Sequence, residues 1–254
     1  MRTEILYEDK SIMVVRKPAG LAVQSAGIGQ PDVVSELKSY LAKLPGAGRP
    51  GKGEPYLGIV HRLDQPVEGL LVFAKDKKAA AALSKQLTEG ALNKHYYAVL
   101  CGYPDCPEGD LVDYLRKEGN VAVAVTGREQ EFADAKIAVL HYRILEEIND
   151  PSPLALADVT IGTGRFHQIR VQFAHAGFPL LGDTKYGMAA LKEAMPAQKY
   201  RGVALCAYSL ELVHPISGKK MGFRVVPKNP AFAGFAMEEL KKLTENETGI
   251  SKRG

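Results

Sequence analysis

What this sequence lacks narrows its class before any motif is considered. Only three of its 254 residues are cysteines, an odd number without the close pairing of a zinc site. We therefore expect Cys101, Cys106 and Cys206 to be reduced and structural. No run approaches the roughly 18 apolar residues of a membrane span, and the N-terminus has no signal-peptide pattern. These absences predict a cytoplasmic protein with no contact to a membrane.

Neither sign of charge is in large excess. The chain has 33 Lys and Arg residues against 29 Asp and Glu residues, a net charge of +4, which alone does not identify a nucleic-acid-binding protein. The sequence has no G-x-S-x-G, Walker lysine loop, H-E-x-x-H or Rossmann glycine fingerprint. Of the six histidines only His167 and His175 share a predicted helix, and their separation is not a ligand spacing, so we expect no metal site.

The hydrophobic pattern predicts an α+β protein. Apolar residues at strand or helix spacing predict strands at residues 5–7, 11–17, 95–100, 137–145, 154–161, 203–213 and 221–226, and helices at 33–44, 77–87, 166–176 and 230–243. Residues 45–55 are dominated by Gly and Pro, and residues from 103 to 134 read as a polar stretch. Strand pairs with few helices favour a largely antiparallel sheet. No shift in composition marks a boundary, so we expect a catalytic domain over residues 1–230 and a C-terminal helix and tail over 231–254.

A charged tetrapeptide interrupts the apolar segment LGIVHRLDQPVEGLLVFAKD, residues 57–76. Two strand-like runs flank His61, Arg62, Leu63 and Asp64. An aspartate followed by Gln-Pro more often caps a turn than performs chemistry. The tetrapeptide alone therefore favours a turn and leaves a catalytic role for Asp64 open.

Two further segments have the same double interpretation. In TGRFHQIR, residues 163–170, Arg165 and Arg170 flank a predicted helix start, where free N–H groups attract phosphate, although they could equally be solvated helix charges. In the strand NKHYYAVLCG, residues 93–102, alternation places Tyr96 on one face, and the ordinary role of such a tyrosine is packing. Pattern alone does not decide either case.

Taken together, the motifs of this chain resemble those of the RluA family of RNA pseudouridine synthases. The resemblance spans about residues 4–226 in family order. It comprises EDKSIMVVRKPAG at 8–20, HRLD at 61–64, GLLVFAK at 69–75, the spaced Lys94, Tyr96, Ala98 and Gly102, TGRFHQIR at 163–170, a Gly-Pro-Gly-Asp-Tyr-Gly pattern over 177–187, and Ala207, Leu210, His214, Pro215 and Gly218.

The resemblance implies both a fold and a reaction. The fold is a mixed, mainly antiparallel sheet flanked by helices around a central active-site cleft. The reaction is isomerisation of uridine in RNA: the N1–C1′ bond breaks, the base rotates and a C5–C1′ bond forms. Asp64 matches the family's catalytic aspartate, Arg170 its cationic partner, and Tyr96 the residue proposed to stack on the base and assist proton transfer.

The resemblance also implies ribosomal or transfer RNA as the partner, with neither cofactor nor metal, and we expect a monomer. Arg62 is the candidate for stabilising the gap left by the flipped base, with His61, Arg165 and Lys75 as further RNA-binding candidates. We expect no S4 RNA-binding module, so the basic loop at 45–55 and lysines of the following helix, Lys77 and Lys78, would also grip RNA.

Two positions depart from the family pattern and support rival hypotheses. Val67 and Glu68 replace the usual Thr-Ser, and Cys206 replaces a common histidine. If Glu68 pointed toward Asp64 it would raise the pKa of that carboxyl, whereas pairing with a basic neighbour would remove the conflict. One rival hypothesis is a catalytically silent RNA-binding protein with the same fold, and another is a glycoside-type hydrolase using Asp64 with Glu68.

Overall fold

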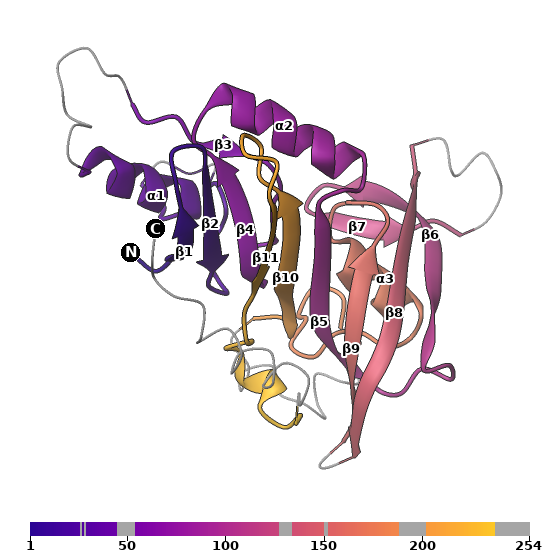
Figure 1. Ribbon diagram of the computed structural model, residues 1–254. Helices are drawn as coiled ribbons and strands as arrows, with labels where there is room; N and C mark the ends of the chain where they lie inside the picture. Colours follow the sequence, from indigo (N-terminus) through magenta and orange to yellow (C-terminus); the bar gives the residue numbers. More distant parts are fainter. Residues whose placement is uncertain are drawn as a thin grey trace. The chain divides into compact units, whose positions relative to one another are not determined.

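The computed structural model describes residues 1–25, 27, 29–44, 54–126, 134–149, 152–187 and 202–236 (Figure 1). It divides into two compact units, the first formed by residues 1–94 and 207–225, the second by 95–206 and 226–254. The chain thus leaves the first unit after Lys94 and returns to it at Ala207. The catalytic domain expected over residues 1–230 contains parts of both units.

The first unit is built on a sheet with the strand order β1-β2-β4-β10; β11 pairs with β10 and β3 with β4. The strands are β1 (Glu4–Glu8), β2 (Ile12–Lys17), β3 (Gly58–Ile59), β4 (Glu68–Ala74), β10 (Leu205–Val213, of which the part from Ala207 belongs here) and β11 (Lys220–Arg224). All residues of β2 and β4 are buried, as expected for central strands covered on both faces. The expected strand at residues 221–226 begins one residue earlier and ends two residues earlier.

Two helices complete the first unit, and each begins directly after an aspartate, at the residue where the sequence predicts its start. The Asp32 side chain accepts from the Ser35 amide at 2.6 Å at the start of α1 (Val33–Ala42), and Asp76 accepts from the Ala79 amide at 2.8 Å at the start of α2 (Lys77–Thr88). These N-caps satisfy amides that lack helical partners. Helix α2 packs against β3 and β4 (Figure 1).

Gly69 permits a close approach of two strands in the first unit. It lies in β4 with φ +130°, and a Cβ there would stand 2.4 Å from the carbonyl oxygen of Ala207 in β10. No larger residue fits this contact without moving backbone. The residue that follows Glu68 is therefore fixed as glycine by packing.

The second unit is an antiparallel sheet with the order β5-β9-β8-β6-β7. Its strands are β5 (Asn93–Cys101), β6 (Glu108–Glu118), β7 (Val121–Ala124), β8 (Lys136–Asn149) and β9 (Pro153–Ile161). Helix α3 (Gln168–His175) packs on β6 and β7. Leu115, Ala122, Ala138 and Val171 form a hydrophobic cluster between the helix and strands β6, β7 and β8.

The polar stretch expected from residue 103 to 134 was a wrong interpretation, because it contains β6 and β7. Exposed and partly buried residues alternate along β6, and charged side chains such as Asp110 conceal its strand pattern. Odd-numbered residues, including Leu115, face α3, so even-numbered ones lie on the opposite face. On that face Val112 and Tyr114 are 58% and 44% exposed, beside Ile137 of β8.

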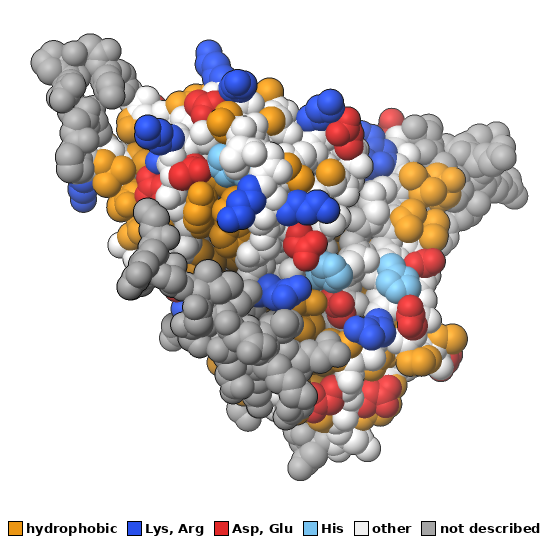
Figure 2. Space-filling model, viewed as in Figure 1, with side chains coloured by type: hydrophobic (Ala, Val, Ile, Leu, Met, Phe, Trp, Pro, Cys, Tyr) orange, Lys and Arg blue, Asp and Glu red, His pale blue; other side chains and the backbone are white. Residues whose placement is uncertain are grey.

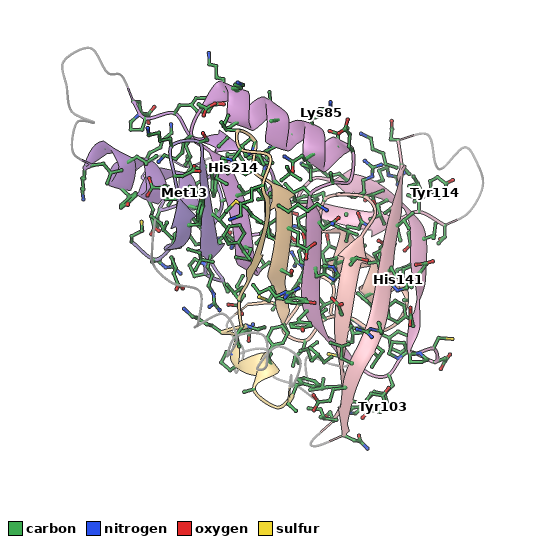
Figure 3. The ribbon with its side chains drawn as sticks, viewed as in Figure 1. Met13, Lys85, Tyr103, Tyr114, His141 and His214 are labelled. Atoms are coloured by element: carbon green, nitrogen blue, oxygen red, sulfur yellow. The ribbon has the colours of Figure 1, made fainter. Side chains whose placement is uncertain are left out.

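Part of this outer face is visible in the space-filling view, where small groups of hydrophobic side chains lie among histidines and charged side chains (Figure 2). Figure 3 labels Tyr114 and His141 on it. Their register agrees, since Tyr114 pairs with Ile137 and His141 with Asp110 on the same face. The exposed residues of this face, such as Tyr114, therefore point away from α3.

The C-terminal helix expected at residues 230–243 is wrong in its first part. Pro230–Phe232 forms a single 3₁₀ turn capped by Asn229, and residues 233–236 are not helical. The rest of that segment and residues 45–53 of the expected basic loop lie outside the described residues. No helix among the residues that the structure describes is long and apolar enough to cross a membrane.

Candidate active site

Asp64 lies in the loop between β3 and β4 of the first unit and is partly buried. Its carbonyl oxygen accepts from the Val67 amide at 3.1 Å, which closes a turn around Gln65 and Pro66. The carbonyl oxygen of Gln65 accepts from the Gly20 amide at 2.8 Å, so the loop is tied to the segment after β2. The turn that the sequence predicts is therefore present, and it positions the Asp64 side chain.

Lys17, at the end of β2, has a buried amine beside this loop. Its side chain is fully buried, and Nζ donates to the carbonyl oxygens of Pro18 (3.0 Å), Leu21 (2.7 Å) and Gln65 (3.0 Å). Burial lowers the pKa of Lys17 to about 7, against the opposing effect of the negative charges of Asp64 and Glu68. The first unit thus buries a lysine side chain with a lowered pKa close to the Asp64 loop.

Glu68, the departure from the family pattern, is buried and paired. Its Oε2 lies 3.4 Å from Nη2 of Arg16, and both side chains are almost wholly enclosed. Of the two orientations considered from the sequence, pairing with a basic neighbour is confirmed. The Thr-Ser replacement therefore gives this chain a buried ion pair next to the Asp64 loop.

His61 lies inside the first unit, although the sequence made it a candidate for RNA binding. Its Nε2 accepts from the Val72 amide at 3.3 Å, and its buried Nδ1 has no hydrogen-bond partner. Burial, with a smaller effect of the Lys94 charge, lowers the pKa of His61 to about 3. An enclosed neutral imidazole supports the strand behind the loop and does not present a charge to phosphate.

The other basic candidates of the first unit differ in their exposure. Arg62, next to His61, is exposed. Lys75 is instead held by Glu8, whose Oε1 lies 2.6 Å from its Nζ, and by the carbonyl oxygen of Asp9. Arg62 is therefore placed to meet a ligand, whereas Lys75 stabilises the junction of β1, β2 and β4.

Tyr96 and Arg170 belong to the second unit. Tyr96 is a buried residue of β5, opposite Val159 of β9. Val159 in turn pairs with Tyr142, whose ring packs edge-on against Phe173 of α3. Cross-strand pairs share a face, so Tyr96 lies on the side of the sheet that α3 covers.

Arg170, in α3, makes a bidentate ion pair with Asp183. Nε and Nη2 of the arginine lie 2.7 and 2.8 Å from the two carboxylate oxygens, and both side chains are buried. The same carboxylate accepts from the amides of Lys185 and Tyr186. The guanidinium also lies 5.1 Å from the centre of the Tyr186 ring. These contacts fix its orientation strongly.

The segment before α3 has an unusual backbone. His167 has φ 53° and is the only non-glycine residue with positive φ among those described, so the helix begins at Gln168, two residues later than expected. Nδ1 of His167 lies 2.6 Å from the Tyr186 hydroxyl. Arg165 is partly buried, and its Nε donates to the carbonyl oxygen of Ile137 at 2.9 Å.

The structure groups the candidate residues by unit. Asp64 and Arg62 belong to the first unit, and Tyr96, Arg165 and Arg170 to the second. That Asp64, Tyr96 and Arg170 line one cleft stays a prediction. No group of metal-binding side chains occurs in the described parts of the chain. Lys17, Asp183 and Tyr186 were present in the motifs, but sequence reasoning gave them no role because it could not show their contacts with Gln65, Arg170 and His167, which lie elsewhere in the chain.

Comparison with solved structures places this architecture in the pseudouridine synthase class. Human RNA Pseudouridylate Synthase Domain Containing 4 matches with a TM-score of 0.67 at 25% identity, covering 89% of each chain. Human RNA Pseudouridylate Synthase Domain Containing 1 has a TM-score of 0.71 over 99% of this chain and 97% of its own, and at 19% identity it supports the fold alone. The expected fold class is confirmed.

Sequence comparison then identifies the family. The RNA pseudouridylate synthase model matches residues 11–175. Ribosomal large subunit pseudouridine synthase D of Zymomonas mobilis is 36% identical over 230 residues, which cover 87% of this chain and 68% of the relative. The protein of the same name from Escherichia coli O6:H1 is 36% identical over 232 residues, 86% and 65% of the two chains. The chain belongs to the RNA pseudouridylate synthase family and spans about two thirds of the length of these relatives.

Proposed function

We propose that this protein isomerises uridine to pseudouridine in RNA, with Asp64 as the catalytic carboxylate. The observation that carries the proposal is the construction of the Asp64 loop in a chain of this family. The loop is tied to the segment after β2 through Gln65 and the buried Lys17. A partly buried carboxylate held in a fixed loop is suited to attack a sugar carbon or to stabilise positive charge on it.

The reaction needs groups that act on the sugar and on the base. Asp64 stabilises or captures C1′ when the N1–C1′ bond breaks, and the base then rotates so that C5 attacks C1′. The C5 proton leaves and N1 gains a proton, so the product is an isomer of the substrate. We assign stacking on the uracil and proton transfer from C5 to Tyr96, and charge stabilisation of Asp64 to Arg170.

RNA recognition adds residues outside this centre. A uridine in a helix must be flipped out before it can react. The exposed Arg62, two residues before Asp64, is the side chain that we assign to the vacated space. We assign phosphate binding to Arg165, which leaves His61 and Lys75 in the supporting roles that their burial and ion pairs favour.

The names of relatives favour a ribosomal substrate. Both curated relatives described above are ribosomal large subunit pseudouridine synthases. We therefore propose large-subunit ribosomal RNA as the substrate and treat transfer RNA as the alternative outcome of the test. The rival hypotheses lose their support, because both relied on Glu68, whose carboxylate pairs with Arg16 inside the first unit.

The decisive experiment measures tritium release from RNA labelled at uridine C5. Unmodified large-subunit ribosomal RNA and transfer RNA transcripts are incubated separately with the protein, and the nucleosides are then separated. We expect release from the ribosomal transcript and a nucleoside of unchanged mass but altered retention. Free uracil would indicate a hydrolase, and no release from either RNA would exclude the proposed activity.

Asp64→Asn is the variant that tests the catalytic assignment. Replacing a partly buried carboxylate by an amide removes the nucleophile but keeps the shape, so we expect turnover to be lost while RNA binding and the thermal unfolding transition are retained. Glu118→Gln is the control, because that carboxylate lies on the exposed end of β6 and pairs with Arg116. Turnover by Asp64→Asn at the wild-type rate would refute the role of this residue.

A further inference from the structure

Phe166 is a large apolar side chain left on the surface four residues before Arg170. It precedes His167, whose positive φ turns the chain just before α3, and 39% of its surface is exposed. The ring stacks on the His167 imidazole with centroids 3.8 Å apart and planes 23° apart. His167 is held in turn by the Tyr186 hydroxyl at 2.6 Å. The aromatic ring is therefore exposed but fixed in orientation.

One cation lies over this ring, and two more come from neighbouring segments of the second unit. Nζ of Lys117, at the end of β6, lies over the ring at 5.0 Å from its centre. Arg165 immediately precedes Phe166, and Nζ of Lys185 donates at 2.7 Å to the carbonyl oxygen of Asn120 in the turn between β6 and β7. All of these residues belong to the second unit. A fixed aromatic ring among cations is the arrangement that single-stranded nucleic acid binds through stacking and phosphate contacts.

A chain of contacts connects this ring to the proposed catalytic machinery. Phe166 stacks on His167, the edge of His167 meets the Tyr186 ring at a centroid distance of 5.5 Å, and the Tyr186 ring lies under the Arg170 guanidinium. Lys117 projects from an odd-numbered position of β6, on the side of the sheet that carries α3. Phe166 is thus on the same side of the second unit as Arg170.

We propose that Phe166 and Lys117 form a binding site for an unpaired nucleotide of the RNA substrate, separate from the uridine that reacts. The base takes the place of the Lys117 ammonium over the face of the Phe166 ring that His167 leaves uncovered, and the ammonium turns to an adjacent phosphate. The strained backbone of His167 holds the ring in place, which lowers the ordering cost of binding. The inference rests on the proposed function only in taking RNA as the ligand.

Apolar exposure alone does not require a ligand, and the second unit contains a matched comparison. Tyr114 is also exposed and aromatic, at 44%, and lies on β6 three residues before Lys117. Three is an odd separation on a strand, so Tyr114 lies on the opposite face, away from α3. If exposure were sufficient for RNA binding, both aromatic residues would contribute equally.

The test measures binding of fluorescein-labelled single-stranded RNA of about 12 nucleotides, a length suited to groove-binding proteins. All variants carry Asp64→Asn, so that no turnover occurs. A second probe has the same backbone but lacks the bases. We expect Phe166→Ala to weaken binding of the complete RNA by about 5- to 150-fold, Phe166→Leu to lose most of this affinity, and Phe166→Trp to retain it.

The base-free probe separates stacking from charge. We expect Phe166→Ala to bind it as the parent does, whereas Lys117→Ala should weaken binding of both probes and reduce the salt dependence of affinity by about one phosphate contact. Tyr114→Ala should bind both probes like the parent. Thermal unfolding of each variant shows whether it is folded.

Several results would overturn the site. The first is that Phe166→Ala binds the complete RNA with the affinity of the parent, and the second is that it loses affinity equally for both probes. The third is that Tyr114→Ala loses as much affinity as Phe166→Ala, and the fourth is that the parent does not bind the complete RNA. The binding measurement does not depend on turnover. Absence of tritium release by the wild-type chain would therefore refute the proposed activity but would not affect the conclusion about the nucleotide site. Conversely, normal turnover with no effect of Phe166→Ala would refute the nucleotide site alone.

Discussion

The buried charges near the candidate residues are balanced inside their own units. Glu68 pairs with Arg16, Lys17 meets carbonyl oxygens beside the Asp64 loop, and Arg170 pairs with Asp183. Removing one partner of such a pair leaves a charge without its counterion in a low-dielectric environment. These contacts fix the orientation of the side chains, which a catalytic or charge-stabilising group needs.

Asp183→Asn should therefore destabilise the protein strongly. The amide keeps the size of the carboxylate but presents a donor to a guanidinium that can only donate, and it removes the charge that balances Arg170. We expect the free energy of unfolding to fall by about 3–5 kcal/mol, measured by urea denaturation. Glu118→Gln, in the exposed pair with Arg116, should cost at most about 1 kcal/mol. Equal stability of Asp183→Asn and wild type would show that the pair contributes nothing.

At the scale of elements, features that depend on residues close together in the sequence were predictable, whereas features that depend on contacts between distant residues were not. The caps Asp32 and Asp76 place α1 and α2 correctly because capping involves residues three apart. Strand β6 was missed because its outer face mixes charges with Val112 and Tyr114. The late start of α3 follows from the positive φ of His167, a conformation that tertiary contacts impose on a residue that ordinarily avoids it.

The junction of β2 with the Asp64 loop should give a specific pH dependence of stability through Lys17. Its pKa is about 7 in the folded state and near 10.5 in its ordinary state, so the unfolded chain binds more protons between these values. Stability contributed by this site therefore rises with pH from about 7 toward 10. We expect the stability of wild type relative to Lys17→Met to increase by up to about 1.4 kcal/mol per pH unit in that window.

Urea denaturation of both proteins at several pH values from about 7 to 10 measures this difference, and taking it removes the contribution of other groups. Lys94, whose pKa burial also lowers, is present in both proteins and cancels. A difference that stays constant with pH would mean that Lys17 keeps its ordinary pKa in the folded protein. A difference that falls with rising pH would mean that its folded pKa is raised instead.

For the whole molecule, motifs far apart in sequence identified the family, but the sequence did not indicate two discontinuous units. The first unit includes residues 207–225, and only tertiary contacts bring this segment back to residues 1–94. The family resemblance supplied Asp64, Tyr96 and Arg170 as candidates. The resemblance did not assign a role to Lys17 or Asp183. Their roles become visible only in the folded chain, where Lys17 Nζ donates to the carbonyl oxygen of Gln65 and Arg170 donates to the Asp183 carboxylate.

The proposed centre draws on both units, and this makes a prediction about the molecule as a whole. If Asp64 and Tyr96 act on one nucleotide, Asp64→Glu and Tyr96→Phe should not have independent effects on the rate of pseudouridine formation. We expect a coupling of about 0.5–3 kcal/mol in a double-mutant cycle of single-turnover rates, because residues that share a partner are not additive. The pair Asp64→Glu and Tyr114→Ala should be additive within about 0.5 kcal/mol, as residues without a shared partner are. Additivity in both cycles would place Asp64 and Tyr96 at separate sites, and the catalytic assignment of Tyr96 would then fail.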